Sequence, residues 1–585
     1  MYSVDDLNSK VWNFLRPDPA VEEEFSRLFP MSRTLCRVLL NRGLHDPDEA
    51  RRFLEPSLDS LHDPSLLDGL DWAVERTKDA LDRNEKIMVH GDYDVDGITS
   101  TALLVRVLRL MGADVSWYIP HRQHEGYDLG RLGVAAARER GVALIITVDC
   151  GSSSAEAVAG ARELGIDVIV TDHHEVGKTM APANAIINPK KPGCTYPFKG
   201  LAGVGVAYKF AEGLVRRCGY DVAVYRQRFC DLAAIGTVAD IVPLLDENRV
   251  LVKAGMEELP RTGKKGLRAL LEVSGLLSSK ISSHMLAFGL GPRLNAAGRL
   301  GHASDAVDLL LTTDDGEARR LAHQLDEKNR ERQLEQERIT AEALQVISDQ
   351  GLDETARVFV LHSQGWHPGI VGIVASKLTD KYCRPSILVA MDSTGMAGVG
   401  SARSIAAFDL FDALERCGHL LDRFGGHRRA AGLSISADKL GEFGEEMNRI
   451  ADEVLTEADF LPQIEVDAEL EMRSVTIDLA RELQCLEPYG YGNRKPIFVS
   501  KDVPIIQRSR IGQTKSHLKL RLGASSSRPV ECIAFGWGER EDAFQIDSLL
   551  DLCYNVQVNQ FAGNETVQAV LTDARMAGSE FIVDS

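Results

Sequence analysis

The stretch that decides the fold is KIMVHGDYDVDG, residues 86–97. Its mostly apolar beginning, 86–90, predicts a buried strand, and the acidic loop that follows leads into a helix expected from about Ile98 to Met111. A strand, a loop and a helix in this order favour a parallel α/β unit. Open parallel sheets bind ligands beyond the carboxyl ends of their strands, so the acidic loop is a candidate site.

Further apolar runs predict more strands of the same sheet. They lie at 142–148 (VALIITV), 167–171 (DVIVT) and 185–187, and helices are expected at about 153–164 and 203–217. Short apolar strands that alternate with helices are typical of a parallel sheet in an α/β domain.

The second half of the chain predicts three more units. Residues 314–350 are dense in Glu, Arg and Gln without proline, which indicates one long, solvated helix. Strands at 357–361 and 386–390, with a helix at about 370–378 between them, predict a second α/β domain. From about 462 to 575, short alternating segments such as 517–522 and 554–558 predict a small OB-like β-barrel.

We therefore expect an α/β protein with two parallel-sheet domains joined by a long helix, followed by an OB-like barrel. The predicted boundaries are an N-terminal helical region 1–75, a catalytic α/β domain 76–312, a linking helix 313–352, a second α/β domain 353–458 and the barrel 459–585.

Composition limits the class of protein. With 585 residues the chain is too long for one hydrophobic core. No apolar run approaches the roughly 18 residues that span a bilayer, and the N-terminus does not predict a secretory signal. Ten scattered cysteines without a C-x-x-C pair indicate reduced thiols and a cytoplasmic location. The net charge of −19 leans against general nucleic-acid binding, so any such function needs a local site.

Acidic residues and histidines gather where the predicted strands end. After the strands at 86–90, 142–148 and 167–171 come, in order, His90, Asp92, Asp94, Asp96, Asp149, Asp172, His173 and His174. Asp240, in TVADIVPL (237–244), follows an apolar segment that is expected to be helical. Parallel strands deliver the side chains that follow the three strands to one edge of the sheet.

Several carboxylates that lie together need cations, because like charges repel and raise one another's pKa. Histidine mixed with aspartate suits Mn²⁺ or Mg²⁺ better than Ca²⁺, and two such ions are typical of phosphoryl-transfer sites. Asp92 is as consistent with a turn as with a ligand, and Asp172 is as consistent with a group that orients its neighbouring histidine.

These motifs resemble the DHH phosphoesterase superfamily. Asp172-His173-His174 is similar to its naming signature, and His90, Asp94, Asp96, Asp149 and Asp240 are similar to its other motifs in order and placement. FGGH (424–427) with AAG (430–432) resembles the associated DHHA1 domain. Segments 291–303, 366–378 and 486–498 resemble the RecJ-type exonucleases within the superfamily. Asp128, in EGYDLG, stands where related sequences often carry glycine, which puts the local turn in doubt.

The resemblance implies roles for individual residues. One metal ion is expected on His90, Asp94 and Asp149, and the other on Asp96, Asp149, His173 and Asp240, so that Asp149 bridges. The catalytic residues are then Asp149 and His174, with His174 at the scissile phosphate. A pocket for the terminal phosphate is implied at Ser401, Arg403 and His427, while Arg122 and Arg293 are candidates for the strand's path and Tyr127 for stacking on a base.

The resemblance implies a monomeric metal-dependent exonuclease that degrades single-stranded DNA from the 5′ end to 5′-mononucleotides, in repair and recombination, with single-strand-binding protein and a helicase as candidate partners. Two alternatives stay open. One is a DHH phosphodiesterase or pyrophosphatase acting on short oligonucleotides or nucleotide phosphates, although such enzymes usually lack a C-terminal barrel. The other is a non-catalytic replication scaffold, which the full set of candidate ligands disfavours.

Overall fold

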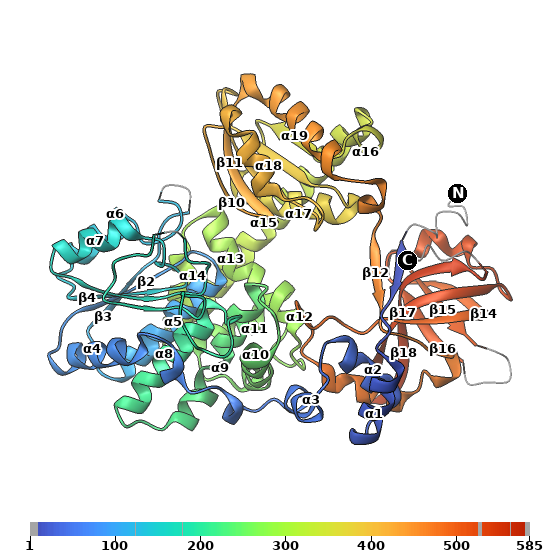
Figure 1. Ribbon diagram of the computed structural model, residues 1–585, viewed down its shortest axis with the longest axis horizontal. Coiled ribbons are helices and arrows are strands. Elements are labelled where there is room, and N and C mark those ends of the chain that lie inside the picture. Colours follow the sequence, from blue (N-terminus) through green and yellow to red (C-terminus); the bar gives the residue numbers. More distant parts are fainter. Residues whose placement is uncertain (1–9, 123–124, 178, 524–528, 562, 579–585) are drawn as a thin grey trace.

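The first domain is built on a five-stranded parallel sheet in the order β3-β2-β4-β5-β6 (Figure 1). The computed structural model describes residues 10–122, 125–177, 179–523, 529–561 and 563–578. The strands of this sheet are β2 (Ile87–Gly91), β3 (Val115–Tyr118), β4 (Leu144–Val148), β5 (Asp167–Thr171) and β6 (Ala185–Ile187). The predicted parallel sheet is thus confirmed, and β3, at its edge, is a strand that the sequence analysis did not find.

Alternate residues of these strands enter two different cores. Val89 and Ile146 pack against the face covered by α5 (Val95–Leu110), α8 (Gly203–Arg217) and α9 (Val222–Ala239). Met88 and Ile145 pack on the other face, against α6 (Arg131–Glu139) and α7 (Ala155–Glu163). Helices on both faces explain why the strands are apolar throughout. The remaining helices of this region are α4 (Leu70–Asp82), α10 (Asp246–Glu258), α11 (Lys265–Val273), α12 (Ser283–Met285), α13 (Gly291–Leu300) and α14 (Ser304–Leu311).

A single helix, α15 (Asp315–Asp349), leads from the first domain to the second, as the glycine-poor charged stretch predicts (Figure 1). The second sheet has the order β10-β11-β9-β8-β7, with β7 (Phe359–Ser363), β8 (Ser386–Met391), β9 (Ala397–Arg403), β10 (Arg423–His427) and β11 (Ala430–Ser436). Only the pair β7–β8, joined through α17 (Pro368–Tyr382), is parallel. The other three pairs are antiparallel, and short turns connect two of them, β8 to β9 and β10 to β11, so this sheet is mixed and not purely parallel as expected. The domain's other helices are α16 (Leu352–Thr355), α18 (Leu410–Arg416) and α19 (Leu440–Val454).

The C-terminal sheet closes into the expected barrel. Its order is β13-β14-β15-β16-β18-β17, and an additional pairing of β14 with β17 closes the ring. The strands are β13 (Ala468–Glu469), β14 (Phe498–Ile511), β15 (His517–Leu522), β16 (Val530–Ala534), β17 (Leu549–Phe561) and β18 (Asn564–Met576), and α20 (Ile477–Leu483) lies beside them. Closure leaves the barrel without a long free edge.

The N-terminal helices pack on this barrel, at the far end of the chain. Figure 1 shows α1 (Pro19–Leu28), α2 (Arg33–Asn41) and α3 (Pro47–Leu54) beside the C-terminal strands, and they share one core with them. β1 (Val11–Phe14) pairs in parallel with β12 (Gln463–Val466), and Trp12 Nε1 donates to Asp573 Oδ2 at 2.7 Å. α4, which crosses the predicted boundary between residues 75 and 76, instead joins the core of the first domain. The predicted domain boundaries stay predictions. Across the described ranges no helix is both long enough and apolar enough to cross a membrane.

Candidate metal centre

The carboxyl ends of three neighbouring strands bring the predicted acidic residues together. Ligand atoms that lie within 4.8 Å of one another form three groups among the described residues, and they are Asp96, His173 and Asp240; Asp149, His173 and His174; and Asp92, Asp94 and Asp149. Asp149 and His173 each belong to two groups, so the three groups form one continuous cluster.

Helix ends hold two of these carboxylates in place. Asp94 caps the N-terminus of α5, where its Oδ1 accepts from the backbone N–H groups of Asp96 at 2.9 Å and Gly97 at 3.1 Å. The carboxylate of Asp96 accepts from Gly203 N–H at 2.6 Å and from Val204 N–H at 2.7 Å, at the N-terminus of α8. Helix N-termini offer backbone N–H donors to carboxylates, so both side chains are held in position by the fold.

Gly203 also explains how α8 can approach the site so closely. A Cβ atom at this position would lie 2.4 Å from Asp149 Oδ1, which is too close for any side chain. Asp149 itself has a φ of 62°, a left-handed conformation that residues other than glycine rarely adopt. Such strain is characteristic of functional sites.

The cluster fits a divalent cation. Asp92 Oδ1, Asp149 Oδ1, His173 Nε2 and Asp240 Oδ2 are buried without a hydrogen-bond partner in the described structure. Burial together with neighbouring carboxylates raises the pKa of Asp92, Asp149 and Asp240 well above its usual value, and it raises that of Asp96 to about 7. Buried unpaired polar atoms are costly, and carboxylate and imidazole donors are those that Mn²⁺ and Mg²⁺ accept.

His90 lies outside the three groups. It is fully buried, its ring stacks on Tyr118 with centroids 5.5 Å apart, and its Nε2 faces the backbone of Gly133 on α6. Burial lowers the pKa of His90 to about 4, so the ring is neutral at physiological pH. Asp92, which the sequence analysis left undecided, occupies the place in the cluster that was expected for His90.

Asp172 lies behind the cluster and orients its neighbour. Its Oδ1 is 2.9 Å from Nδ1 of His174, and its carboxylate also accepts from the backbone N–H groups of Ser152 and His173. These hydrogen bonds outweigh burial and hold the pKa of Asp172 below its usual range. Burial lowers the pKa of His174, but the bond to Asp172 and the negative charges of Asp172, Asp96 and Asp94 together raise it by more. Asp172 therefore positions His174 and favours its protonated form.

Tyr127 contacts His174 directly. Its hydroxyl lies 2.9 Å from Nδ1 of His174, and the two rings meet edge to face at 5.4 Å. Tyr127 is still 45% exposed, so this contact does not cover the whole residue. The next residue, Asp128, has a φ of 84°, which accounts for the glycine that related sequences often carry there.

Arginines from four separate segments of the chain converge beside the acidic cluster. Burial and the nearby guanidinium groups of Arg122, Arg332 and Arg403 lower the pKa of Arg299, on α13, to about 9. Burial and Arg122 likewise lower the pKa of Arg403. Cations gathered in this way repel one another, and an anion in their midst would relieve the repulsion. Arg299 and Arg332 are members of this cluster that the sequence analysis missed.

The other predicted phosphate contacts are placed differently. Ser401 and Arg403 lie on β9 and face Gly372 of α17. His427 is exposed at the end of β10, in register with Ala430, which in turn is in register with Arg403. Arg293 is held in an ion pair at 2.9 Å with Asp326 of α15 and is not brought into the arginine cluster.

Comparison with known proteins matches three parts of the chain to family models. Residues 86–237 match the DHH family N-terminal domain, residues 355–453 the DHHA1 domain and residues 466–573 the RecJ OB domain.

Whole-chain relatives agree with these matches. The chain is 39% identical over 572 residues to the single-stranded-DNA-specific exonuclease RecJ of Bacillus subtilis, covering 98% of this chain and 72% of the relative. It is 37% identical to RecJ of Escherichia coli, covering 92% and 95% of the two chains. The crystal structure of RecJ from Thermus thermophilus in complex with Mn²⁺ matches with a TM-score of 0.83 and 31% identity, covering 98% of this chain and 80% of that one.

Proposed function

The chain belongs to the RecJ family of single-stranded-DNA-specific exonucleases, and on that basis we propose that it hydrolyses single-stranded DNA with bound divalent metal ions. The observation that carries the proposal is the buried cluster of aspartates and histidines beside a cluster of arginines. An enzyme that cleaves a DNA strand from its end needs a site that activates water at a phosphodiester and a site that holds anionic phosphate.

Two metal ions are proposed. Asp96, His173 and Asp240 would hold one, Asp94 and Asp92 would hold the other, and Asp149 lies in reach of both sets. The sequence-based assignment of His90 to the second ion stays a prediction: His90 lies outside the three groups, although its Nε2 is also buried without a hydrogen-bond partner in the described structure. When bound, the ions supply charge neutralisation and an activated water at neutral pH.

His174 is proposed to contact the scissile phosphate. Its side chain is 44% exposed, whereas that of the neighbouring His173 is 7% exposed. Asp172 accepts from its Nδ1–H, so Nε2 is left to donate towards substrate. A protonated imidazole in this position would stabilise the negative charge that develops on the phosphate oxygens.

The arginine cluster is proposed to hold the 5′-terminal phosphate. Arg403 and Arg122 offer forked donors, and Ser401 can add a hydroxyl. An end bound beside the metal cluster would place the first phosphodiester at the reacting centre, so cleavage would proceed from 5′ to 3′ and release 5′-mononucleotides. Arg299 and Arg332 would add positive charge to this phosphate site.

A groove between the first domain and the barrel supports a polymeric substrate. It has a volume of about 430 Å³, and its lining includes the exposed side chains of Ile241, Phe288 and Tyr491 as well as Arg494 and Lys495. Ile241 directly follows the proposed ligand Asp240. Aromatic rings and cations in one groove are the means by which single strands are bound without sequence preference.

The biological setting is proposed to be DNA repair and recombination. Binding to single-strand-binding protein and to a helicase, a monomeric state and a cytoplasmic location stay predictions from the sequence.

The test is a nuclease assay on single-stranded and double-stranded oligonucleotides labelled at either end, with Mn²⁺ or Mg²⁺ and with EDTA. Metal-dependent release of mononucleotides from the 5′ end of single strands is expected. Cleavage only of dinucleotides or of nucleotide phosphates would favour the small-substrate alternative, and DNA binding without cleavage under any metal would favour the scaffold.

A further inference from the structure

β3 leaves one edge of the catalytic sheet open. It pairs with β2 on one side, and within the described ranges no strand pairs with it on the other. Ile87 N–H donates to Asp114 O at 3.0 Å, so in this parallel ladder Asp114 and Ser116 turn their backbone groups towards β2. Val115 and Trp117 therefore turn theirs outwards. An open strand edge is a template for another chain unless it is covered.

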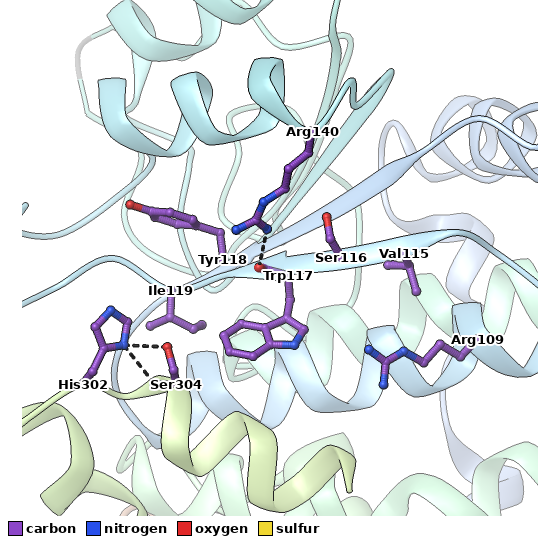
Figure 2. Close-up of a pocket in the computed structure, with 9 residues that line it drawn as sticks. All are labelled: Arg109, Val115, Ser116, Trp117, Tyr118, Ile119, Arg140, His302 and Ser304. Carbon is purple, nitrogen blue, oxygen red and sulfur yellow. Dashed lines mark hydrogen bonds between the residues drawn. The ribbon is translucent and has the colours of Figure 1, made fainter.

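A hollow of about 540 Å³ lies against this open edge. Its lining takes side chains from both faces of β3, Trp117 on one face and Tyr118 on the other, so it opens at the strand's edge (Figure 2). All four residues of the strand are half-buried. The hollow is within the usual range for ligand sites, roughly 300–1,000 Å³.

The ionisable side chains that line the hollow are two arginines, a histidine and Tyr118, whose hydroxyl donates to Glu125 outside the lining. Figure 2 shows Arg140 approaching β3 from one side and Arg109 from the other, with His302 beside Trp117. No aspartate or glutamate is among the lining residues. Arg109 is exposed at the C-terminal end of α5 and has no ion pair in the described structure, although the chain as a whole carries a net charge of −19. The hollow is thus a basic site on an acidic protein.

We propose that this edge is a docking site for an extended, acidic peptide segment of a partner protein, which adds to the sheet as a strand next to β3. Its backbone would pair with the outward groups of Val115 and Trp117, as in other complexes formed by strand addition. Its carboxylates would meet Arg109 and Arg140, and an apolar side chain would cover Trp117.

The open backbone favours a peptide over a nucleic acid. The Trp117 carbonyl already accepts from Arg140 Nη1 at 3.0 Å, which shows that the edge takes hydrogen bonds from outside the sheet. A strand edge offers alternating donors and acceptors, which match another peptide backbone but not a row of phosphates, which only accept. The arginines alone would suit either ligand, so the test includes both.

The experiment is a selection of linear peptides from a phage-displayed library on the full-length protein, with counter-selection on Arg109→Glu/Arg140→Glu. Enriched peptides should carry Asp or Glu among β-branched residues. By fluorescence anisotropy they should bind the double variant at least tenfold more weakly than wild type. Val115→Pro, which removes an outward N–H at an edge position that tolerates proline, should weaken binding as well.

Arg319→Glu/Arg320→Glu is the matched control, because it makes the same change of charge at two exposed positions of α15 away from the hollow. All variants should keep wild-type unfolding temperature and cleavage of oligothymidylate. The proposal is overturned if no acidic sequence is enriched, or if the enriched peptides bind the double variant as tightly as wild type. It is also overturned if the double variant loses affinity for oligothymidylate, which would assign the hollow to nucleic acid.

Discussion

His173 Nε2 lies 3.1 Å from Asp149 Oδ1, yet neither atom has a hydrogen-bond partner in the described structure. Both side chains are almost fully buried, with 7% and 2% exposed. Two buried polar atoms that lie this close without a hydrogen bond between them could both be satisfied by one further atom bound to each. A cation between them would satisfy both, and this relationship makes Asp149 the residue on which the cluster depends.

Asp149→Ala should reduce cleavage of single-stranded DNA at least a thousandfold, which corresponds to a barrier increase on the order of 4 kcal/mol. Asp149 joins two of the three ligand groups, so its loss affects both proposed ions. His90→Ala should cost much less, because His90 lies outside the groups. Initial rates measured with Mn²⁺ check this prediction. Asp71→Ala, an exposed aspartate on α4, is the control, and near wild-type activity in Asp149→Ala would refute the assignment.

Arg403→Ala should slow cleavage of 5′-phosphorylated strands far more than that of 5′-hydroxyl strands. One lost charge-assisted contact costs roughly 1.5–3 kcal/mol, which is roughly a tenfold to hundredfold loss of rate. Metal affinity should not change, because Arg403 lies in the second domain. The measurement compares initial rates on matched oligonucleotides.

Arg293→Ala is the control for the phosphate pocket. Its ion pair with Asp326 places it outside the arginine cluster, so its loss should affect both substrates alike. If Arg403→Ala also lowers the cleavage rates of 5′-phosphorylated and 5′-hydroxyl strands equally, Arg403 binds the strand elsewhere or supports the fold and does not bind the 5′-phosphate.

Tyr491→Ala should weaken binding of long single strands while leaving cleavage of very short ones unchanged. Tyr491 is 64% exposed in the groove that leads from Asp240 to the barrel. Loss of one stacked base costs about 1–3 kcal/mol, or roughly a fivefold to hundredfold loss of affinity. Anisotropy with labelled oligothymidylates of increasing length measures the effect.

Tyr220→Ala removes a similarly exposed tyrosine, 52% exposed, outside this groove and should have no effect. Point variants are preferable to deletion of the barrel, because α1 to α3 share its core and would lose their packing. Equal affinity of Tyr491→Ala and wild type at every length would remove Tyr491 from the strand's path.

The sequence predicted the catalytic sheet and most of its acidic cluster because both depend on local signals. Apolar runs mark β2, β4 and β5, and parallel strands bring their carboxyl ends to one edge whatever the rest of the fold. His90 lies outside the three groups of ligand atoms, and its assignment to an ion stays a prediction. It follows Met88 by two residues, so it lies on the same face of β2 and turns towards α6.

The phosphate pocket was predicted less well because it depends on contacts between domains. Arg293 and Arg299 lie on the same helix, and only the position of Asp326 on α15 decides which of them is held in an ion pair. The packing of the N-terminal segment on the barrel is a similar case. Trp12 and Asp573 are 561 positions apart, and nothing in either segment predicts that the two residues are in contact. β3 was not predicted because its short VSWY segment is half-buried and lacks a clear apolar run.

The last prediction concerns the stability of the metal-free protein as pH changes. Burial and neighbouring carboxylates raise the pKa of Asp96 to about 7 and that of Asp149 and Asp240 well above the usual value. Such a group keeps a proton that the unfolded chain, with a pKa of about 3.9, has released, so stability falls as pH rises towards the folded pKa. His90 and His173 oppose this, because burial lowers their pKa to about 4 and about 3. Their contribution is complete above about pH 6.5, the pKa of an unfolded histidine.

Between about pH 6.5 and 8, therefore, the groups of this cluster that still titrate are the raised carboxyl groups and His174, whose raised pKa acts in the same direction, and buried thiols do not yet contribute. The unfolding temperature of protein dialysed against EDTA should fall as pH rises through this window. Protein loaded with Mn²⁺ should not show the fall, because the cation replaces the protons, and at a hundredfold excess over Kd it adds about 2.7 kcal/mol of stability. Scanning calorimetry of both forms at matched ionic strength measures the difference, and Asp149→Ala should respond to Mn²⁺ much less than wild type. A metal-free protein whose stability is flat or rising across this window would show that the cluster does not hold the repelling charges from which its metal site is inferred.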